Sequence, residues 1–384
     1  MKIPPLSDEE RDRTDVQLLD PIDYRKSGLS LNHIIGCPLD CAYCVRHVFA
    51  NFEMKQPRLV MSDESAVALL LSHRFFQKHL TPLQIFNRAT DPFLPGVKHH
   101  TFNVLRLLAD SGIRNHVLLI TRFSVDERDA EKLNEFNPLR LTLLVTYSGI
   151  DDKRIEPTGW ERAAQSLKTA FGKARAYRTV LYWRPVIVGL NDSPLHLQRA
   201  RELSRFAHAT VFTGLFYRNT IQDHYRSKSL PEPYSETARR KILPRDLERR
   251  ILSAFSEGSA GPLFRKTSCG VAAAHGEPDY NGHYGVREIC DICPASQVAR
   301  CAAIFRSPPA DALSGLAERV GIDQEPAVTS RALIYDDVDE QRRYFLQHSL
   351  GHQVHDRRYP HLHGQHGRAL VGWGDPGVND DDDG

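Results

Sequence analysis

The chain has 384 residues, of which 41% are hydrophobic and 26% are charged, so its length allows one large core and an appendage. Its 50 Lys and Arg nearly balance its 48 Asp and Glu, which excludes a uniformly basic surface committed to nucleic acid but not a local basic groove. No apolar run approaches the ~20 residues of a membrane span, and the charged N-terminal segment lacks the apolar stretch of a secretory signal. We therefore expect a soluble protein of the reducing cytoplasm.

Apolar runs rich in β-branched residues alternate with segments of helical periodicity along the first half of the chain. The pattern predicts strands over residues 29–35, 83–87, 116–122, 140–148, 178–189 and 209–216. It predicts intervening helices over residues 63–79, 98–112, 125–136, 160–174 and 193–207, the last with Ser193 as its N-cap. Such β/α repeats are typical of a parallel sheet, either a partial barrel or an open doubly wound sheet. In both, the site lies at the carboxyl ends of the strands.

The rest of the chain suggests appendages to this core. The expected regions are an N-terminal extension (1–28), the β/α core (29–216), a linker with a basic helix (217–260), a cysteine-rich region (261–310), a strand and a helix (311–350), and a disordered tail (351–384). The basic run ARRKILPRDLERR is interpreted as a solvated helix face in preference to a phosphate-binding patch. The histidines of the tail are interpreted as a metal-scavenging tract: His352, His355, His361, His363 and His366.

Three of the seven cysteines crowd together directly after the first predicted strand: Cys37, Cys41 and Cys44. In a reducing compartment, such clusters bind metal or do redox chemistry more often than they form disulfides. Gly36 and Pro38 favour a loop there, and a loop allows the three thiolates to converge. A zinc site would need a fourth ligand, for which His33 and His47 are near in sequence.

The spacing Cys-x3-Cys-x2-Cys, with the aromatic Tyr43 before the last cysteine, resembles the hallmark motif of the radical S-adenosylmethionine (SAM) enzymes. The resemblance implies a partial (β/α)6 TIM-like barrel of the radical SAM type with a C-terminal Cys-rich extension. It implies that the three thiolates hold a [4Fe-4S] cluster whose fourth iron binds SAM. A flavodoxin- or ferredoxin-type donor would reduce the cluster, which would cleave SAM to a 5'-deoxyadenosyl radical that abstracts hydrogen from a substrate.

Four later segments resemble successive strand-end motifs of the spore photoproduct lyase-like branch of that family: NRATDPFLPG, HVLLITRFS, VTYSGIDDKRIEPTG and RPVIVGLNDS. The resemblance implies that SAM-facing groups lie at these strand ends, in addition to Tyr43: Thr90, Asp91, Arg122, Thr146, Ser148 and Asn191.

Each of these assignments has a structural alternative. Thr90 and Asp91 precede a proline and suit a simple turn. Arg122 suits a charge-assisted fork on the SAM carboxylate or a place in solvent. Asn191 suits an adenosine contact or, with Asp192 and Ser193, a helix cap. A nearby pair, Arg154 and Glu156, is interpreted as an ion pair that braces the loop after the fourth strand.

The four remaining cysteines all follow the predicted core: Cys269, Cys290, Cys293 and Cys301. Four thiolates suit a second, auxiliary [4Fe-4S] cluster, which we favour, or a structural zinc. His275 and His283 lie in the same segment and either replace a cysteine or line a substrate pocket with Asp279, Tyr280 and Asn281.

This division of the cysteines bears on the reaction. Spore photoproduct lyase relies on an extra cysteine as hydrogen-atom donor, and here none would be left over. Repair of a thymine photoproduct is therefore less expected than a tailoring reaction on an unidentified organic substrate. The alternative is a zinc-stabilised nucleic-acid-binding or DNA/RNA-repair-like protein related to spore photoproduct lyase.

Overall fold

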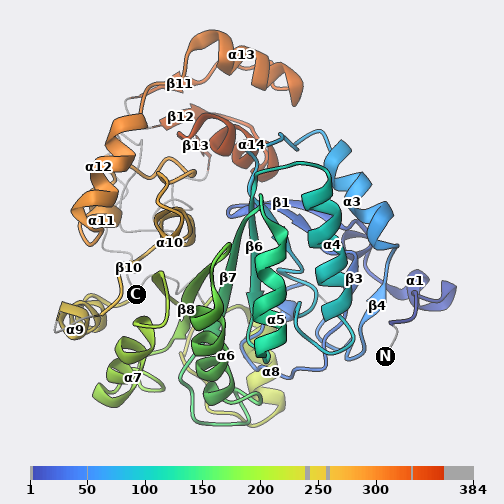
Figure 1. Ribbon diagram of the computed structural model, residues 1–384, viewed down its shortest axis with the longest axis vertical. Coiled ribbons are helices and arrows are strands. Elements are labelled where there is room, and N and C mark those ends of the chain that lie inside the picture. The colour runs from blue at the N-terminus through green and yellow to red at the C-terminus, as the bar shows by residue number, and fades with distance from the viewer. Residues whose placement is uncertain (1–2, 50, 238–242, 257–259, 330–331, 359–384) are drawn as a thin grey trace.

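The centre of the protein is a mixed sheet in the order β1-β2-β5-β6-β7-β8-β9-β10 (Figure 1). The structure is a computed structural model that describes residues 3–49, 51–237, 243–256, 260–329 and 332–358. β1 is antiparallel to β2, and all other neighbouring pairs are parallel. The strands are β1 (Ile22–Arg25), β2 (Gly28–Leu31), β5 (Leu83–Ile85), β6 (His116–Thr121), β7 (Arg140–Tyr147), β8 (Arg178–Val186), β9 (Ala209–Gly214) and β10 (Leu263–Phe264).

Helices connect the parallel strands, as the sequence pattern predicts. Ser62 and Ser193 cap the helices that follow them, since their side chains accept hydrogen bonds from backbone N–H groups of the first turn. The connecting helices are α3 (Asp63–Ser72), α4 (Lys98–Asp110), α5 (Glu127–Lys132), η2 (Leu133–Phe136), α6 (Trp160–Lys173), α7 (Pro194–Ser204), α8 (Asn219–Ser227) and α9 (Arg245–Ser256).

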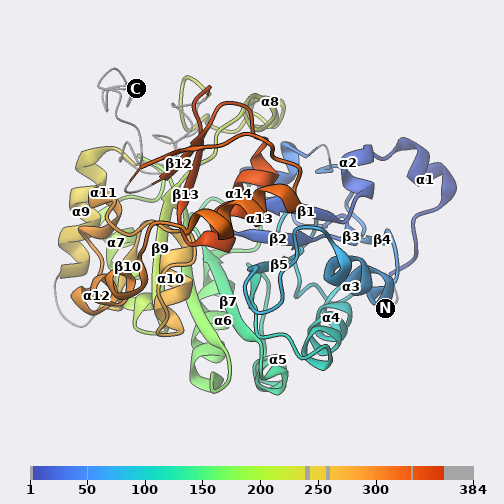
Figure 2. The same cartoon turned by 90° about the horizontal axis from the view of Figure 1, so that it is seen from above.

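The two faces of the sheet have different partners (Figure 2). Val117 and Leu119 of β6 belong to a large core with buried residues of helices α3 to α7, whereas Leu118 between them belongs to a second core with α10 (Thr267–Ala274). Helices α3 to α7 therefore cover one face, as in the wall of a barrel and unlike a doubly wound sheet. β1 and β10 form opposite edges of the strand order, so closure of the sheet is not observed among the described residues.

Helix α10 lies on the inner face and runs antiparallel to β8. Arg178 at the start of β8 donates to the carbonyl of Ala274 at the end of the helix, with an Nε to O distance of 3.1 Å. At the other end of the helix, the hydroxyl of Thr267 lies 3.0 Å from that of Tyr182, further along β8. The first turn of α10 therefore lies toward the carboxyl ends of the strands, where a functional site is expected.

The C-terminal elements pack on the first strand rather than on the last. Helix α14 (Glu340–Leu350) contacts β1 through the Nδ1 of His348, 2.9 Å from the Tyr24 hydroxyl, and through Gln341, which accepts from the Tyr24 backbone N–H at 3.0 Å. A small sheet lies beside α14, with β11 (Ala327–Val328) and β13 (Gln353–Asp356) on either side of β12 (Ala332–Tyr335).

The remaining elements are α1 (Asp8–Arg13), α2 (Val16–Leu19), β3 (Ile34–Ile35), η1 (Val45–His47), β4 (Arg58–Leu59), α11 (Arg287–Cys290), α12 (Ala295–Ile304) and α13 (Ala310–Arg319).

Several predicted boundaries were wrong. The strand predicted over 29–35 divides into β2 and β3, because β3 pairs with β4 in a separate sheet. The helix predicted over 63–79 ends at Ser72, because the next residue is extended. β10 is a parallel strand that sequence periodicity missed, since it has only two residues.

The predicted tail was also partly wrong. Its first residues form β13, which pairs in parallel with β12, and His352 and His355 are buried there. The first five residues of the basic run, ARRKI (238–242), and the histidines of residues 361–366 lie outside the described residues. Within the described ranges, no helix has both the length and the apolar composition needed to cross a membrane.

Gly270 allows α10 to approach β9, and its replacement gives the first prediction. A β-carbon at Gly270 would lie 2.5 Å from a methyl group of Val211, whereas one at Gly172 of helix α6 meets no heavy atom within 4 Å. Gly270→Ala should lower the free energy of unfolding by about 1–3 kcal/mol, the range for overpacking. The control Gly172→Ala should raise it by about 0.5–1 kcal/mol. Urea unfolding measures both, and equal stability of the two variants would contradict the close packing of α10.

Candidate functional site

The loop that carries the first three cysteines follows β3 at the carboxyl end of β2, as predicted. Gly36 has a φ of +98°, and a β-carbon there would lie 2.4 Å from the carbonyl oxygen of Gln56, so the turn into the loop requires glycine. Arg46 holds the loop from inside, since its guanidinium donates to the carbonyl of Cys37 at 2.9 Å and to three further carbonyl groups, those of Asn51, Phe52 and Met54.

The three thiols of this loop line one pocket. Cys37 and Cys41 are buried and Cys44 is half-buried. Burial raises the pKa of Cys37 to about 11 and raises that of Cys41 well above its usual range. Without a metal, these two thiols therefore stay protonated at neutral pH, and a metal that binds them must displace their protons. Three thiols that line one pocket at a strand end can together bind a metal ion or a metal cluster.

Most of the predicted SAM-facing residues line the same pocket: Tyr43, Thr90, Asp91, Arg122 and Thr146. They come from the cysteine loop and from the carboxyl ends of β5, β6 and β7. Arg184, near the carboxyl end of β8, also lines it and was missed by the sequence analysis. Its position just before Pro185 at the end of a predicted strand was the signal that could have found it.

A buried carboxylate, Glu156, organises one side of this pocket. Its Oε2 lies 3.0 Å from Nη1 of Arg122 and accepts from the Ser148 hydroxyl at 3.1 Å. The Tyr43 hydroxyl donates to the same oxygen and accepts from Arg122. Oε1 accepts from the Thr158 hydroxyl at 2.6 Å. The acid thus joins the cysteine loop to residues that follow β6 and β7.

The charge balance of this network favours the ionised acid. Burial opposes ionisation of Glu156, but the Arg122 guanidinium and the hydroxyl donors together hold its pKa below the usual range. The proposed Arg154–Glu156 pair was wrong, because Arg154 pairs with Asp152 at 2.6 Å and Glu156 pairs with Arg122. Arg122 therefore lies in the pocket, paired with a carboxylate, and not in solvent.

Asp91 and Thr90 have different surroundings. Asp91 accepts from the Thr121 hydroxyl at 2.7 Å and from the backbone N–H groups of Arg122 at 2.9 Å and Phe93 at 3.0 Å, so it ties the end of β5 to the end of β6. Burial nevertheless raises its pKa. The hydroxyl of Thr90 is buried without a hydrogen-bond partner in the part of the chain that the structure describes, and it lines the pocket.

Asn191 lies outside the residues that line the pocket. Its Nδ2 donates to the carbonyls of Ser148 at 2.6 Å and Pro185 at 2.8 Å, and its Oδ1 accepts from the N–H of Ile187 at 2.7 Å. These bonds connect the ends of β7 and β8. The helix cap that the sequence analysis weighed for this turn is supplied by Ser193.

The other four cysteines line a second pocket: Cys269, Cys290, Cys293 and Cys301. Cys269 comes from α10, Cys290 from α11 and Cys301 from α12. Burial raises the pKa of Cys293 to about 12 and also that of Cys269. The seven cysteines of the chain thus divide between two pockets with none outside them. Four thiols in one pocket suit either an iron-sulfur cluster or a tetrathiolate zinc.

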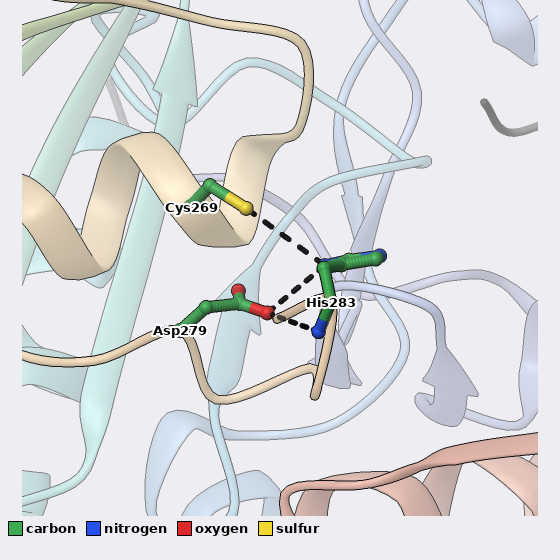
Figure 3. A group of neighbouring side chains, drawn as sticks. All are labelled: Cys269, Asp279 and His283. Atoms are coloured by element: carbon green, nitrogen blue, oxygen red, sulfur yellow. Dashed lines mark hydrogen bonds and ion pairs between the residues drawn. The ribbon is translucent and has the colours of Figure 1, made fainter. Parts of the chain in front are cut away.

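A carboxylate–histidine pair borders the second pocket (Figure 3). Nδ1 of His283 lies 3.0 Å from Oδ2 of Asp279 and 3.8 Å from Sγ of Cys269. These three residues present ligand atoms within 4.8 Å of one another, which is a spacing suited to a metal ion. The backbone N–H of Asp279 lies 3.4 Å from Sγ of Cys301. His283 is therefore close enough to assist or replace a cysteine ligand.

The other residues predicted for this region are placed elsewhere. Nε2 of His275 lies 2.9 Å from the Thr142 hydroxyl near the start of β7, so this histidine does not approach the cysteines. Asn281 donates to the carbonyl of Lys26 at 3.1 Å and accepts from Gln347 at 2.9 Å, so it braces the C-terminal elements against the turn after β1. Tyr280 packs against the ring of His116 with centroids 5.1 Å apart.

Solved structures with a similar fold include several of spore photoproduct lyase. One variant of that enzyme is 12% identical with a TM-score of 0.45, covering 66% of this chain and 82% of that chain. Another, with bound AdoMet and dinucleoside spore photoproduct, is 10% identical with a TM-score of 0.45, covering 67% and 83%. Streptococcus suis SuiB is 11% identical with a TM-score of 0.41, covering 66% and 54%.

No protein-family model and no curated protein matches the chain in sequence.

The buried acid of the first pocket gives the second prediction. Glu156→Gln should lower the free energy of unfolding by about 3–5 kcal/mol at pH 7, because it leaves the Arg122 charge without its partner. The folded-state pKa of Glu156 is lowered, so its stabilisation is present above the unfolded pKa of about 4.3 and is lost as the pH falls. The difference from the wild type should therefore shrink below about pH 4.

Urea unfolding between about pH 3 and 7 measures this difference. The control Asp152→Asn removes the more exposed carboxylate that pairs with Arg154 and should change stability little. A stability difference for Glu156→Gln that is the same at every pH would show that Glu156 is not ionised in the folded protein.

Proposed function

We propose that this protein is a radical SAM enzyme, in which Cys37, Cys41 and Cys44 hold a [4Fe-4S] cluster that supplies reductive cleavage of SAM to a 5'-deoxyadenosyl radical. The observation that carries this proposal is that the three thiols and the ends of β5, β6 and β7 line one pocket. The donor set leaves one iron open, and SAM would reach it from the strand ends. The radical would abstract hydrogen from an organic substrate that is not identified.

The residues of the chain have separable roles in this proposal. Arg46 holds the cysteine loop by binding its carbonyl groups, and thereby positions the thiols without touching SAM. Arg122 supplies the charge for the SAM carboxylate, with Glu156 and Tyr43 fixing its orientation. Thr90 and Thr146 offer hydroxyl groups to the same cofactor, and the buried, unpartnered hydroxyl of Thr90 supports this assignment.

The fold proposed for this enzyme is the partial (β/α)6 TIM-like barrel of the radical SAM type. The one-sided placement of the connecting helices supports it. Burial of Cys37 and Cys41 at 5% and 1% exposure would protect the site from water and oxidants. A flavodoxin- or ferredoxin-type protein is the electron donor we propose.

The four C-terminal cysteines are proposed to hold a second [4Fe-4S] cluster, with zinc as the alternative. Their common pocket and the His283 imidazole beside it support a metal there. Because all seven cysteines lie in the two pockets, none is left as a hydrogen-atom donor. This favours an oxidation, a decarboxylation or a rearrangement over photoproduct repair.

The nucleic-acid-binding alternative has less support. Two of the basic side chains in helix α9 are engaged by carboxylates, since Arg249 pairs with Asp246 and Arg250 pairs with Asp192 at 2.7 Å. Paired cations contribute less to phosphate binding than free ones.

Cys41→Ala tests the proposed function directly. After anaerobic reconstitution, the wild type incubated with SAM and dithionite should form 5'-deoxyadenosine. The variant should form none, because the cluster loses one of its three protein ligands. Chromatographic detection of 5'-deoxyadenosine measures this, with circular dichroism to show that the variant is folded. Retained turnover by a folded Cys41→Ala protein would rule out the proposed site.

The second metal site is tested in a chain that lacks the first. A triple variant with Ala at Cys37, Cys41 and Cys44 should bind about four irons and four sulfides after anaerobic reconstitution, as one tetrathiolate cluster requires. Iron, sulfide and zinc analysis on the same sample measures the metal content. Zinc in place of iron would make the C-terminal region a structural clip instead.

A further inference from the structure

The arginines that line the first pocket differ in what already binds them. Arg46 donates to four backbone carbonyl groups, and Arg88 donates to two and pairs with a carboxylate. Arg122 is paired with Glu156. Arg184 has no carboxylate partner among the described residues, although it lines the same pocket. Among these four arginines, Arg184 is the one that the described residues bind through a single hydrogen bond, to a hydroxyl group.

Contacts along β8 hold Arg184 in place. Its guanidinium carbon lies 4.6 Å from the ring centroid of Tyr182, two residues earlier on the same face of the strand. Its Nη1 donates to the Tyr182 hydroxyl at 2.9 Å. The same hydroxyl lies 3.0 Å from that of Thr267, and either of the two can donate in this hydrogen bond. A guanidinium has five N–H donors, and the bond to Tyr182 uses one of them. Arg184 is therefore held in its orientation while most of its donors are left for a ligand.

The contacts from Arg184 through Tyr182 to Thr267 lie between the two cysteine pockets. Arg184 borders the first pocket, and Thr267 begins the helix that carries Cys269 of the second. Arg122, by contrast, lies with Tyr43 and Glu156 on the side of the cysteine loop. A ligand group bound to Arg184 would thus lie away from the group that we assign to the SAM carboxylate, toward the inner face of the sheet.

We propose that Arg184 binds an oxyanion of the substrate, a carboxylate or a phosphate, and holds the substrate between the two metal sites. This proposal rests on the proposed function and adds a substrate class to it. A planar guanidinium with free N–H donors matches such an oxyanion in a two-pronged, charge-assisted contact. The Tyr182 hydroxyl and ring fix the direction of the fork, so less conformational entropy is lost when the anion binds.

The test measures binding of two simple anions to reconstituted protein that is saturated with SAM and kept free of reductant, so that SAM is not cleaved during the titration. Inorganic phosphate, followed by ³¹P NMR, and ¹³C-labelled formate, followed by ¹³C NMR, should both show line broadening when they bind. Arg184→Met should weaken binding of the preferred anion by about ten- to hundredfold, the range expected for loss of hydrogen bonds to a charged group. Arg184→Lys should retain part of the binding, and the stronger of the two probes identifies the class of oxyanion.

The same variants are checked for SAM affinity, because Arg184 is assigned to the substrate and Arg122 to the SAM carboxylate. The affinity for SAM should fall by much less than the affinity for the preferred anion. The matched control is Arg249→Met, which removes an exposed arginine of α9 that pairs with Asp246 and should leave anion binding unchanged. If Arg184→Met fails to fold, Arg184→Lys and Tyr182→Phe, which disturbs the fork without removing its charge, are measured instead.

Two outcomes would overturn the proposal. Unchanged binding of both anions in the Arg184 variants would show that the guanidinium does not hold an oxyanion. A tenfold loss of SAM affinity in Arg184→Met would assign the residue to the cofactor. Absence of 5'-deoxyadenosine from the wild type would instead overturn the proposed function, and the effect of the variants on anion binding would still be read from the same NMR titrations.

Discussion

The buried carboxylate of Glu156 is the interaction on which the first pocket depends. It binds Arg122 at 3.0 Å and the Ser148 hydroxyl at 3.1 Å, and it accepts from Tyr43. A buried acid of this kind is costly unless every charge and donor around it is paired, so the network tolerates few arrangements. That constraint brings the cysteine loop, the end of β6 and the end of β7 to a single geometry, as the function that we propose for this pocket requires.

Helix α10 gives the protein its second constraint. It packs on the inner face of β6 to β9, and Gly270 lets its backbone approach β9. The helix carries Cys269 of the second pocket and contacts β8 through Thr267, whose strand partner Tyr182 holds Arg184 of the first. The two cysteine pockets are therefore connected through one rigid element and one strand. Their separation is set by packing rather than by a flexible linker.

The C-terminal elements pack on the β1 edge of the sheet. Asn281 follows α10 and contacts both the turn after β1 and helix α14. Helix α14 in turn packs on β1 through His348. The segment between α10 and α11 is thus held from two sides, which places Asp279 and His283 next to the cysteines without long secondary structure around them.

The sequence by itself determined the repeating α/β order, the loop of Cys37, Cys41 and Cys44, and the grouping of four cysteines near the C-terminus. These features are local: hydrophobic periodicity reports each helix and strand, and cysteines within eight residues meet wherever a loop allows. Most of the residues chosen at strand ends also reached the pocket, because parallel strands bring their carboxyl ends to one edge.

Only the tertiary structure decided which charged groups face one another. Glu156 meets Tyr43 across 113 residues of sequence and Arg122 across 34, and the sequence analysis paired it with Arg154 instead. The sequence analysis likewise did not predict that Arg184 lines the first pocket or that α10 packs on the inner face of the sheet. Such contacts depend on how twisted strands and helices pack against one another. The periodicity of a sequence shows which face of an element a side chain is on, but not which side chain of another element it meets.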